Sequence, residues 1–316
     1  MNDRRIDRRT LLRLGGAAGV ALCLPARAQT NAEAAASAAS APRAVPTLTG
    51  GAALPRVGLG SWITFNVGND AAARTQCTDV IAAFFAAGGQ LIDSSPMYGS
   101  SQAVIGAALK QLNMLPRVFA ADKVWIAPAS RGPAQIEASR ALWGVARFDL
   151  LQVHNLLAWQ EHLPELLQMK AAGQLRYVGI TTSEGRRMRD VEQIMRNHPI
   201  DFVQVSYSLA DRRAEDRIFP LARERGIAVI ANRPFEQGDL LRALARHALP
   251  PVAAELQCTS WAQFALKFVV SHPAVTCAVP ATTSVAHVRE NMAAGLANLP
   301  DGGQRNRMSV QTASLL

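Results

Sequence analysis

Beyond residue 48 the chain alternates between two patterns of apolar positions. Short runs rich in β-branched residues predict strands, and longer segments with apolar residues three and four positions apart predict amphipathic helices. Runs such as Ala228-Val229-Ile230-Ala231 lack alternation, as is typical of parallel strands that are buried on both faces. Eight strands are predicted, at residues 57–62, 90–93, 117–124, 150–154, 176–181, 202–206, 227–231 and 275–279.

Helical segments lie between these strands, and several end at glycines, where a left-handed cap is favoured. They span residues 71–87, 101–112, 133–145, 161–172, 185–196, 213–225, 260–271 and 285–297. Successive strand ends, counted at Asp93, Lys123, His154 and Thr181, lie 30, 31 and 27 residues apart, close to the ~30 residues of a βα unit. Eight such units predict an α/β protein with a (β/α)₈ TIM barrel over residues 48–316, in which residues 235–258 insert a loop or short helix.

A doubly wound open sheet is the alternative architecture. Such a sheet usually carries a glycine-rich fingerprint after its first strand. Gly58-x-Gly60 lies within the first predicted strand here, and the third glycine of the fingerprint is missing. The barrel is therefore the preferred interpretation.

The first 28 residues have the features of an export signal in the expected order. Arg8-Arg9 precede the apolar stretch 14–24, which is too short to span a bilayer, and Ala26-Arg27-Ala28 has the small-x-small pattern of a cleavage site. The segment resembles a twin-arginine signal peptide, whose machinery exports folded proteins. A basic tail with chance arginines is the alternative.

The leader predicts where the mature protein resides. We expect export in the folded state to the periplasm or another extracytoplasmic compartment, with no stable membrane span after cleavage. Residues 29–47 form an Ala/Ser/Pro segment with few large apolar side chains, and we expect them to be a flexible linker.

The composition is that of a globular protein, with 316 residues of which 49% are hydrophobic and 18% charged. The net charge of +9 includes +4 from the six Arg and two Asp of the first 28 residues, and the other basic residues are scattered. A nucleic-acid partner is not indicated, because the sequence lacks a basic stripe with interleaved aromatic residues. Outside the leader, Cys77, Cys258 and Cys277 form no CxxC pair, so buried reduced thiols are expected rather than a zinc site or disulfides.

Four polar residues fall at three consecutive strand ends, where barrels of this kind carry their working residues. Asp93 ends the second strand, Tyr98 follows in its loop, Lys123 lies near the end of the third strand, and His154 ends the fourth. Reduction of a carbonyl by hydride requires an acid for the developing alkoxide, and a nearby ammonium lowers the pKa of a phenol. We expect Tyr98 to be that acid, activated by Lys123, whose charge Asp93 holds in place. Neutral His154 is expected to orient the substrate oxygen.

Each of these residues also has a structural explanation when taken alone. Asp93 could cap the following helix, and Tyr98 could be an ordinary loop residue. Lys123 could extend from a strand end into solvent, and His154 could be a core histidine. Their joint occurrence at successive strand ends favours a catalytic site.

The sequence resembles the aldo-keto reductase family over roughly residues 54–291. The longest matching signature runs from Gly89 to Ser101 and contains Asp93 and Tyr98 in register. Weaker matches surround Lys123 and His154 and occur at residues 54–62, 176–181, 279–280 and 290–291. The resemblance implies a barrel that binds NADP(H) or NAD(H) at its carboxyl-terminal face and reduces aldehydes or ketones to alcohols.

The resemblance also implies cofactor contacts. The family's carboxamide-binding serine and glutamine correspond to Thr181 and Gln204, and its adenine-contacting asparagine corresponds to Asn291. Where the family often has an asparagine after the serine, this chain has Thr182, which keeps a hydroxyl but loses an amide donor.

Two further positions depart from the family pattern. Asn232 stands where an aromatic residue usually stacks on nicotinamide, with Arg233 and Phe235 as candidate replacements. The usual basic residues for a 2′-phosphate are missing near Ala281 and His287, and Arg289 is the candidate substitute. The resemblance favours NADP(H) over NAD(H). The candidate walls of the substrate pocket are Trp62, Trp125 and Phe235.

Two other functions are weighed against a reductase. The altered cofactor positions suit a non-catalytic nicotinamide-binding or sensor protein on the same barrel. A barrel hydrolase or lyase would need a carboxylate pair or a metal cluster at the strand ends, where only Asp93 stands out. A soluble nicotinamide pool is not expected outside the cytoplasm, so an exported reductase is expected to fold around its cofactor and hold it tightly.

Overall fold

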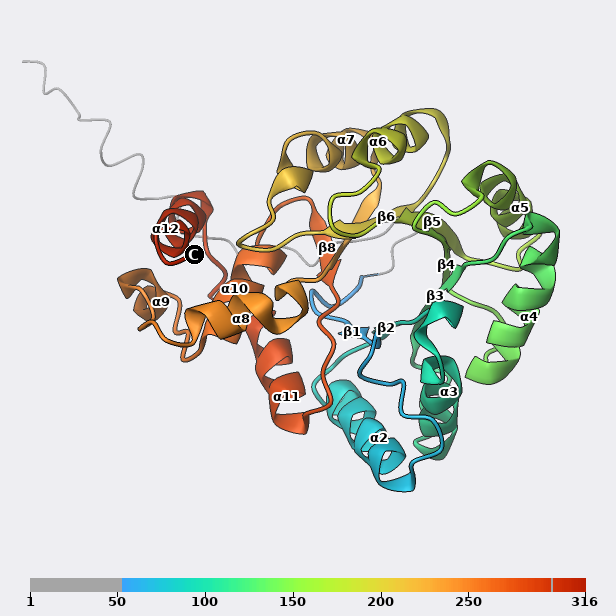
Figure 1. The fold of residues 1–316 in the computed structure, drawn as a ribbon, viewed down its shortest axis with the longest axis horizontal. Helices are drawn as coiled ribbons and strands as arrows, with labels where there is room; N and C mark the ends of the chain where they lie inside the picture. Colours follow the sequence, from blue (N-terminus) through green and yellow to red (C-terminus); the bar gives the residue numbers. More distant parts are fainter. Residues whose placement is uncertain (1–52, 297) are drawn as a thin grey trace, which may run out of the picture. The chain divides into compact units, whose positions relative to one another are not determined.

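The computed structural model describes residues 53–296 and 298–316. The predicted signal peptide (1–28) and linker (29–47) lie outside the described residues. Eight parallel strands form one sheet in the order β1 to β8, and helices surround them in Figure 1. The strands are β1 (Leu59–Gly60), β2 (Leu91–Asp93), β3 (Phe119–Val124), β4 (Leu150–His154), β5 (Tyr177–Thr181), β6 (Phe202–Ser206), β7 (Ala228–Asn232) and β8 (Val275–Ala278).

Contacts between the first and last strands close the barrel. Val57 forms a parallel bridge with Ala278, and Gly60 forms one with Ala281. A Cβ atom at Gly60 would lie 2.7 Å from the carbonyl oxygen of Val279, so the close approach of the two strands requires glycine there. The predicted (β/α)₈ barrel is confirmed, and the open sheet is excluded because its two edges meet.

Most helices between strands lie close to the predicted segments, but α7 begins five residues later than predicted, because the 3₁₀ turn η3 (Arg213–Glu215) precedes it. The helices are α2 (Ala71–Ala86), α3 (Ser101–Gln111), α4 (Gly132–Trp143), α5 (Trp159–Ala171), α6 (Met188–Asn197), α7 (Ile218–Arg225), α10 (Trp261–Val270) and α11 (Val285–Ala294). Helix α6 begins three residues later than predicted, because Gly185 and Arg187 have φ angles of 65° and 54°, which an α-helix does not accommodate.

The segment predicted as an insertion contains the short helices η4 (Glu236–Gly238), α8 (Asp239–Leu244) and α9 (Pro251–Glu255). The sequence reading missed the final helix α12 (Gly302–Ala313). Its start carried a readable signal, because Asp301 and Gln304 form a capping box. Shorter 3₁₀ turns are η1 (Pro96–Tyr98), η2 (Ala129–Arg131) and η3 (Arg213–Glu215).

The core has an inner and an outer layer. The inner layer fills the barrel with strand side chains such as Leu91, Leu150 and Ile230, and the outer layer packs the helices against the strands. Phe119, Tyr177 and Phe202 are the first residues of their strands and pack ring to ring. These rings fill the amino-terminal end of the barrel, which leaves the carboxyl-terminal end for a site.

Three statements concern cysteines, membrane spans and metal sites in the part of the chain that the structure describes. Cys77, Cys258 and Cys277 are buried and free, as predicted. Across residues 53–296 and 298–316, no helix is long and apolar enough to cross a membrane. The same residues contain no group of three His, Cys, Asp or Glu side chains arranged to hold a metal ion.

Candidate active site

A buried ion pair lies at the centre of the carboxyl-terminal face. Lys123 Nζ is 2.6 Å from Asp93 Oδ2, and the Lys123 side chain has no exposed surface. The same ammonium donates a hydrogen bond to the carbonyl oxygen of Ser94 at 2.7 Å. Burial opposes the charged form of Lys123, but the neighbouring Asp93 carboxylate and Tyr98 outweigh it, so the pKa of Lys123 is raised. Lys123 therefore remains an ammonium at neutral pH.

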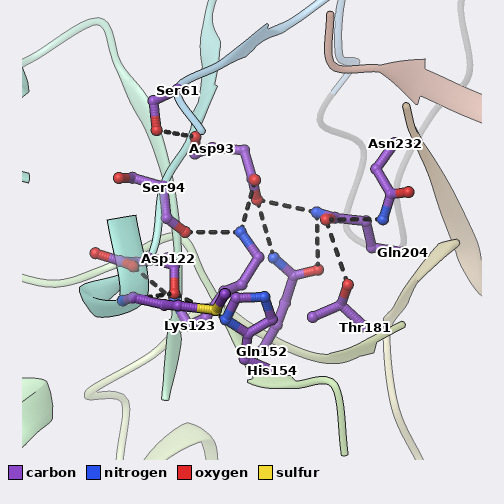
Figure 2. Close-up of polar contacts among 12 residues, drawn as sticks. Ser61, Asp93, Ser94, Asp122, Lys123, Gln152, His154, Thr181, Gln204 and Asn232 are labelled. Atoms are coloured by element: carbon purple, nitrogen blue, oxygen red, sulfur yellow. Dashed lines mark hydrogen bonds and ion pairs between the residues drawn. The ribbon is translucent and has the colours of Figure 1, made fainter. Parts of the chain in front are cut away.

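The second oxygen of Asp93 receives two amide donors. Gln204 Nε2 lies 2.9 Å and Gln152 Nε2 lies 3.2 Å from Asp93 Oδ1 (Figure 2). The carboxylate thus accepts hydrogen bonds from three side chains on β3, β4 and β6. The sequence predicted the strand at residues 150–154, but it did not assign Gln152 to the site.

Tyr98 lies beside this pair at the end of η1, the 3₁₀ turn that Ser95 caps. Lys123 Nζ is 5.1 Å from the centroid of the Tyr98 ring. Gly99 follows with a φ of 60°, which glycine adopts without strain. The structure therefore brings the predicted acid next to its predicted activator.

Two opposing effects set the pKa of Tyr98. Burial raises the pKa of Tyr98, the ammonium of Lys123 lowers it, and burial prevails, so the net pKa lies above the usual value for tyrosine. Lys123 limits the rise rather than producing a net decrease. The phenol is protonated at neutral pH and can donate its proton to an oxygen.

His154 completes the predicted group of four. Its ring centroid lies 5.7 Å from that of Tyr98, edge to face. Burial and then the charge of Lys123 lower the pKa of His154 to about 2, so the imidazole is neutral. Its Nδ1 lies 2.8 Å from Ser95 Oγ.

Ser95 Oγ has two neighbours within hydrogen-bond distance. It accepts a hydrogen bond from the backbone N–H of Met97 at 3.2 Å, and it lies 2.8 Å from His154 Nδ1. When the hydroxyl donates to Nδ1, the single hydrogen of the neutral ring is on Nε2. The sequence reading missed Ser95, because nothing in its local pattern indicates a contact with a residue 59 positions away.

Hydroxyl and amide groups continue along β5, β6 and β7. Thr181 Oγ1 donates to Gln204 Oε1 at 3.3 Å, and Asn232 Nδ2 donates to the carbonyl oxygen of Thr182 at 3.0 Å. Ser206 Oγ donates to Asn232 Oδ1 at 2.8 Å. Thr181, Gln204 and Asn232 line a cleft of about 450 Å³, and Figure 2 shows them on one side of Asp93.

The cleft contains most of the predicted binding residues. Asp93, Tyr98 and His154 line it together with Thr181, Gln204, Arg233 and Asn291. Of the predicted substrate walls, Trp62 and Phe235 line the cleft. The Trp125 ring lies beside it, with its centroid 6.4 Å from that of His154.

Two predicted cofactor residues are not part of the cleft wall. Thr182 is buried and its hydroxyl donates to the carbonyl oxygen of Arg186 at 2.7 Å. Arg289 is exposed on α11, whereas His287 and Asn291, one helical turn apart, face the cleft. Residues two positions apart on a helix point in different directions, so the helix that directs His287 and Asn291 inward directs Arg289 elsewhere. The cleft also includes Glu184, Arg186 and His287, which the sequence reading did not assign.

The donors of the cleft fit an anionic nucleotide with a carboxamide. Arg233 pairs with Glu184, and its Nε is buried without a partner among the described residues. Ser284 caps the amino terminus of α11. Thr282 and His287, on either side of this cap, line the cleft. The amino terminus of a helix suits a phosphate. Thr181, Gln204 and Asn232 offer both donors and acceptors to an amide.

Asp122 points away from the cleft on the strand that carries Lys123. Its carboxylate accepts hydrogen bonds from Trp143 Nε1 at 2.6 Å and from Gln102 Nε2 at 2.7 Å, both buried. Burial raises its pKa to about 7, against the opposing effect of Lys123 and these donors. These contacts join β3 to α3 and α4, and so fix the strand from which Lys123 projects.

Comparison with known proteins agrees with this geometry. Residues 56–303 match the model of the aldo/keto reductase family. Methylglyoxal reductase YeaE of Escherichia coli (strain K12) is 30% identical over 252 residues, which cover 78% of this chain and 87% of that protein. The NADH-specific methylglyoxal reductase of the same organism is 26% identical over 319 residues, with 81% and 94% covered. The crystal structure of an aldo/keto reductase from Klebsiella pneumoniae in complex with NADP and acetate has a TM-score of 0.70 at 25% identity and covers 84% of this chain and 94% of that one.

Proposed function

This chain belongs to the aldo/keto reductase family, and from that premise we propose that Tyr98 is the proton donor in its NAD(P)H-dependent reduction of aldehydes or ketones. One observation carries the assignment. The neutral phenol of Tyr98 and the neutral imidazole of His154 line one cleft, and the buried ammonium of Lys123 lies against the ring of Tyr98. An acid, its electrostatic neighbour and a second donor are the groups that a developing alkoxide requires.

Different side chains protonate the substrate oxygen, stabilise the resulting phenolate and orient the oxygen. When bound, the reduced nicotinamide supplies the hydride. Tyr98 donates the proton to the oxygen, and the ammonium of Lys123 stabilises the phenolate that remains. Asp93 holds that ammonium at 2.6 Å. His154, with its hydrogen on Nε2, donates a hydrogen bond that orients the same oxygen before transfer.

The cofactor proposal follows from the wall of the cleft. Thr181, Gln204 and Asn232 would hold the carboxamide, and Arg233 and the amino terminus of α11 would hold phosphates. Asn291 lies one turn beyond His287 for the base. We favour NADP(H) over NAD(H), because His287 supplies a polar contact for a 2′-phosphate at this end of the cleft. The structural relative bound to NADP supports this preference, and the NADH-specific relative is the counterexample to test.

Steady-state kinetics on purified protein test the reductase proposal. Methylglyoxal is the first substrate to assay, because both curated relatives are methylglyoxal reductases. We expect NADPH oxidation that depends on the carbonyl, and a loss of at least about a hundredfold in kcat in Tyr98→Phe. Fluorescence titration should show that Tyr98→Phe still binds NADPH. Nucleotide binding without turnover on any carbonyl would instead favour a sensor, and full activity in Tyr98→Phe would reject the proposed acid.

The leader supports a proposal about location. Arg8-Arg9, the apolar stretch 14–24 and Ala26-Arg27-Ala28 favour export of the folded protein by the twin-arginine machinery. A reductase outside the cytoplasm needs a nucleotide that travels with it. We therefore propose that the protein binds its cofactor before export and that a second substrate resets the cofactor on the enzyme.

A further inference from the structure

We propose that Gln152 is a positioning residue for carbonyl reduction, because it fixes the Asp93 carboxylate that holds Lys123. The inference rests on the proposed reductase function and adds one residue to the group that acts on Tyr98. Gln152 lies on β4, two positions before His154. Its side chain acts on the reaction through Asp93 and contacts neither substrate nor cofactor.

The position of Gln152 in the barrel is unusual for an amide. Side chains along a barrel strand alternate between the interior and the surrounding helices. Leu150 belongs to the inner layer of the core and His154 lines the cleft, so Gln152 between them points into the barrel. It has no exposed surface, and a buried amide without hydrogen bonds destabilises a protein. The amide is therefore tolerated there only because it has polar partners.

Both ends of the Gln152 amide have partners at the centre of the site (Figure 2). Its Nε2 donates to Asp93 Oδ1 at 3.2 Å, and its Oε1 accepts from Gln204 Nε2 at 3.4 Å. A carboxylate only accepts hydrogen bonds, so the nitrogen end of the amide has to face Asp93. Lys123 Nζ lies 2.6 Å from the other carboxylate oxygen, Oδ2. Donors on both oxygens prevent the carboxylate from rotating, and Oδ2 stays directed at Lys123.

Gly179 leaves the space in which the two glutamines meet. It lies on β5, between Gln152 on β4 and Gln204 on β6, and it is paired with Gln152 in the sheet. A Cβ atom at Gly179 would lie 3.2 Å from Gln152 Cγ and 2.8 Å from the carbonyl oxygen of Phe202. The contact between the glutamines thus depends on the missing side chain of the strand that separates them.

Gln204 also donates to Asp93 Oδ1, at 2.9 Å, but it has a second role. It lines the cleft, and its Oε1 accepts from Thr181 Oγ1 at 3.3 Å and from Asn232 Nδ2 at 3.4 Å. A carboxamide that binds Gln204 competes with these contacts, since the donors and acceptors of the amide already have partners. Gln152 has no exposed surface, so a ligand in the cleft does not reach it. Gln152 is therefore the donor that stays on Asp93 when the cofactor binds.

The consequence for Tyr98 is electrostatic. Lys123 Nζ lies 5.1 Å from the centroid of the Tyr98 ring, where its charge stabilises the phenolate that forms on proton transfer. If Asp93 can turn, the ammonium loses its fixed place and this stabilisation is no longer preorganised. A hydrogen bond to a charged group is strong enough to change a rate by about tenfold. The loss should appear in kcat rather than in binding.

Matched variants of the two glutamines test this division of roles. Gln152→Leu removes the amide at similar volume, and we expect kcat for methylglyoxal reduction with NADPH to fall about tenfold. Its dissociation constant for NADPH, from fluorescence titration, should stay within about twofold of the wild-type value. Gln204→Leu should instead weaken NADPH binding by at least about fivefold, because that amide lines the cleft. Leu151→Val is the packing control, since Leu151 belongs to the outer layer of the core, and it should keep the wild-type kcat.

The pH profile of Gln152→Glu separates positioning from packing. The introduced carboxyl has the shape of the amide, but it can donate to Asp93 only when it is protonated. Burial and the charge of Asp93 raise its pKa above the usual glutamate value of about 4.3, so the donor is present at low pH and is lost as pH rises. We expect kcat close to the wild-type value at about pH 5.5 and at least about tenfold lower at about pH 8.5. Gln152→Leu should be equally slow at both pH values.

Thermal unfolding checks that each variant is folded, and Gln152→Glu decides the question if Gln152→Leu does not fold. A kcat of Gln152→Leu within about twofold of wild type, or the same kcat of Gln152→Glu at both pH values, would overturn the role of Gln152 and leave the reductase proposal standing. The absence of wild-type turnover on every carbonyl with either nucleotide would reject the reductase, and the role of Gln152 with it.

Discussion

Ser95 Oγ and His154 Nδ1 lie 2.8 Å apart across 59 residues of sequence. A Ser95 hydroxyl that donates to Nδ1 favours the imidazole form that has its hydrogen on Nε2, the form able to orient a substrate oxygen. We therefore predict that Ser95→Ala lowers kcat about fivefold to tenfold, the range expected for one buried neutral hydrogen bond. Ser95→Thr keeps the hydroxyl and should recover most of the rate.

Two measurements separate this role from a merely structural one. Thermal unfolding should show Ser95→Ala folded, and nitrogen-15 NMR of His154 should show a mixture of tautomers in place of one. Unchanged kcat and an unchanged tautomer in Ser95→Ala would remove Ser95 from the mechanism.

The pH dependence of reduction should lack a histidine step. His154 has a pKa of about 2, so it stays neutral as pH falls below the usual histidine value of about 6.5. The pKa of Tyr98 is raised, so the acid is lost only above the usual tyrosine value of about 10. We expect kcat to be flat between about pH 5 and pH 9, measured with a stable substrate at saturating nucleotide. A decrease in rate centred near pH 6.5 that disappears in Ser95→Ala would contradict the neutral imidazole.

Removal of one partner of the buried ion pair should damage stability as well as activity. Lys123→Met leaves Asp93 charged and buried, which typically costs about 3–5 kcal/mol, and we expect a corresponding loss in urea unfolding experiments. The double variant Lys123→Met/Asp93→Asn removes both charges and should regain much of the stability. Its kcat should remain at least about a hundredfold low, because the phenolate has lost its ammonium. A double variant as active as the wild type would show that the pair is structural.

Cofactor preference should depend on His287 rather than Arg289. His287 lines the cleft and Arg289 does not, although both lie in the first turns of α11. We predict that His287→Ala weakens NADPH binding about fivefold and NADH binding less, as expected for one polar contact to a phosphate. Arg289→Ala is the matched control and should leave the ratio of the two dissociation constants unchanged. A changed ratio in Arg289→Ala alone would restore the sequence-based assignment.

Exported protein should contain nucleotide. Native protein from the extracytoplasmic fraction should release NADP(H) on denaturation, detected by mass spectrometry at close to one per chain. Arg8→Lys/Arg9→Lys should keep the protein in the cytoplasm, because the export machinery reads the arginine pair. Nucleotide-free protein in the exported fraction would contradict loading before transport.

The sequence determined the features of this protein that depend on neighbouring residues. Buried strands without alternation, helices at regular intervals and glycines at helix ends predicted a barrel, and the segment from Gly89 to Ser101 placed Asp93 and Tyr98 at one strand end. The side-chain period of a strand and the length of a βα unit are local properties. Because all strands are parallel, their carboxyl ends meet at one face, so Lys123 and His154 could be assigned without coordinates.

The tertiary structure decided what depends on residues far apart in sequence. It connected Ser95 to His154, directed Gln152 and Gln204 to Asp93, and turned Arg289 away from the cleft while His287 faces it. It also set the net pKa of Tyr98: Lys123 lowers that pKa as expected, but desolvation depends on everything packed around the phenol and outweighs this one charge. Hydrogen-bond direction and burial are set by packing in three dimensions, and no local pattern of residues contains them.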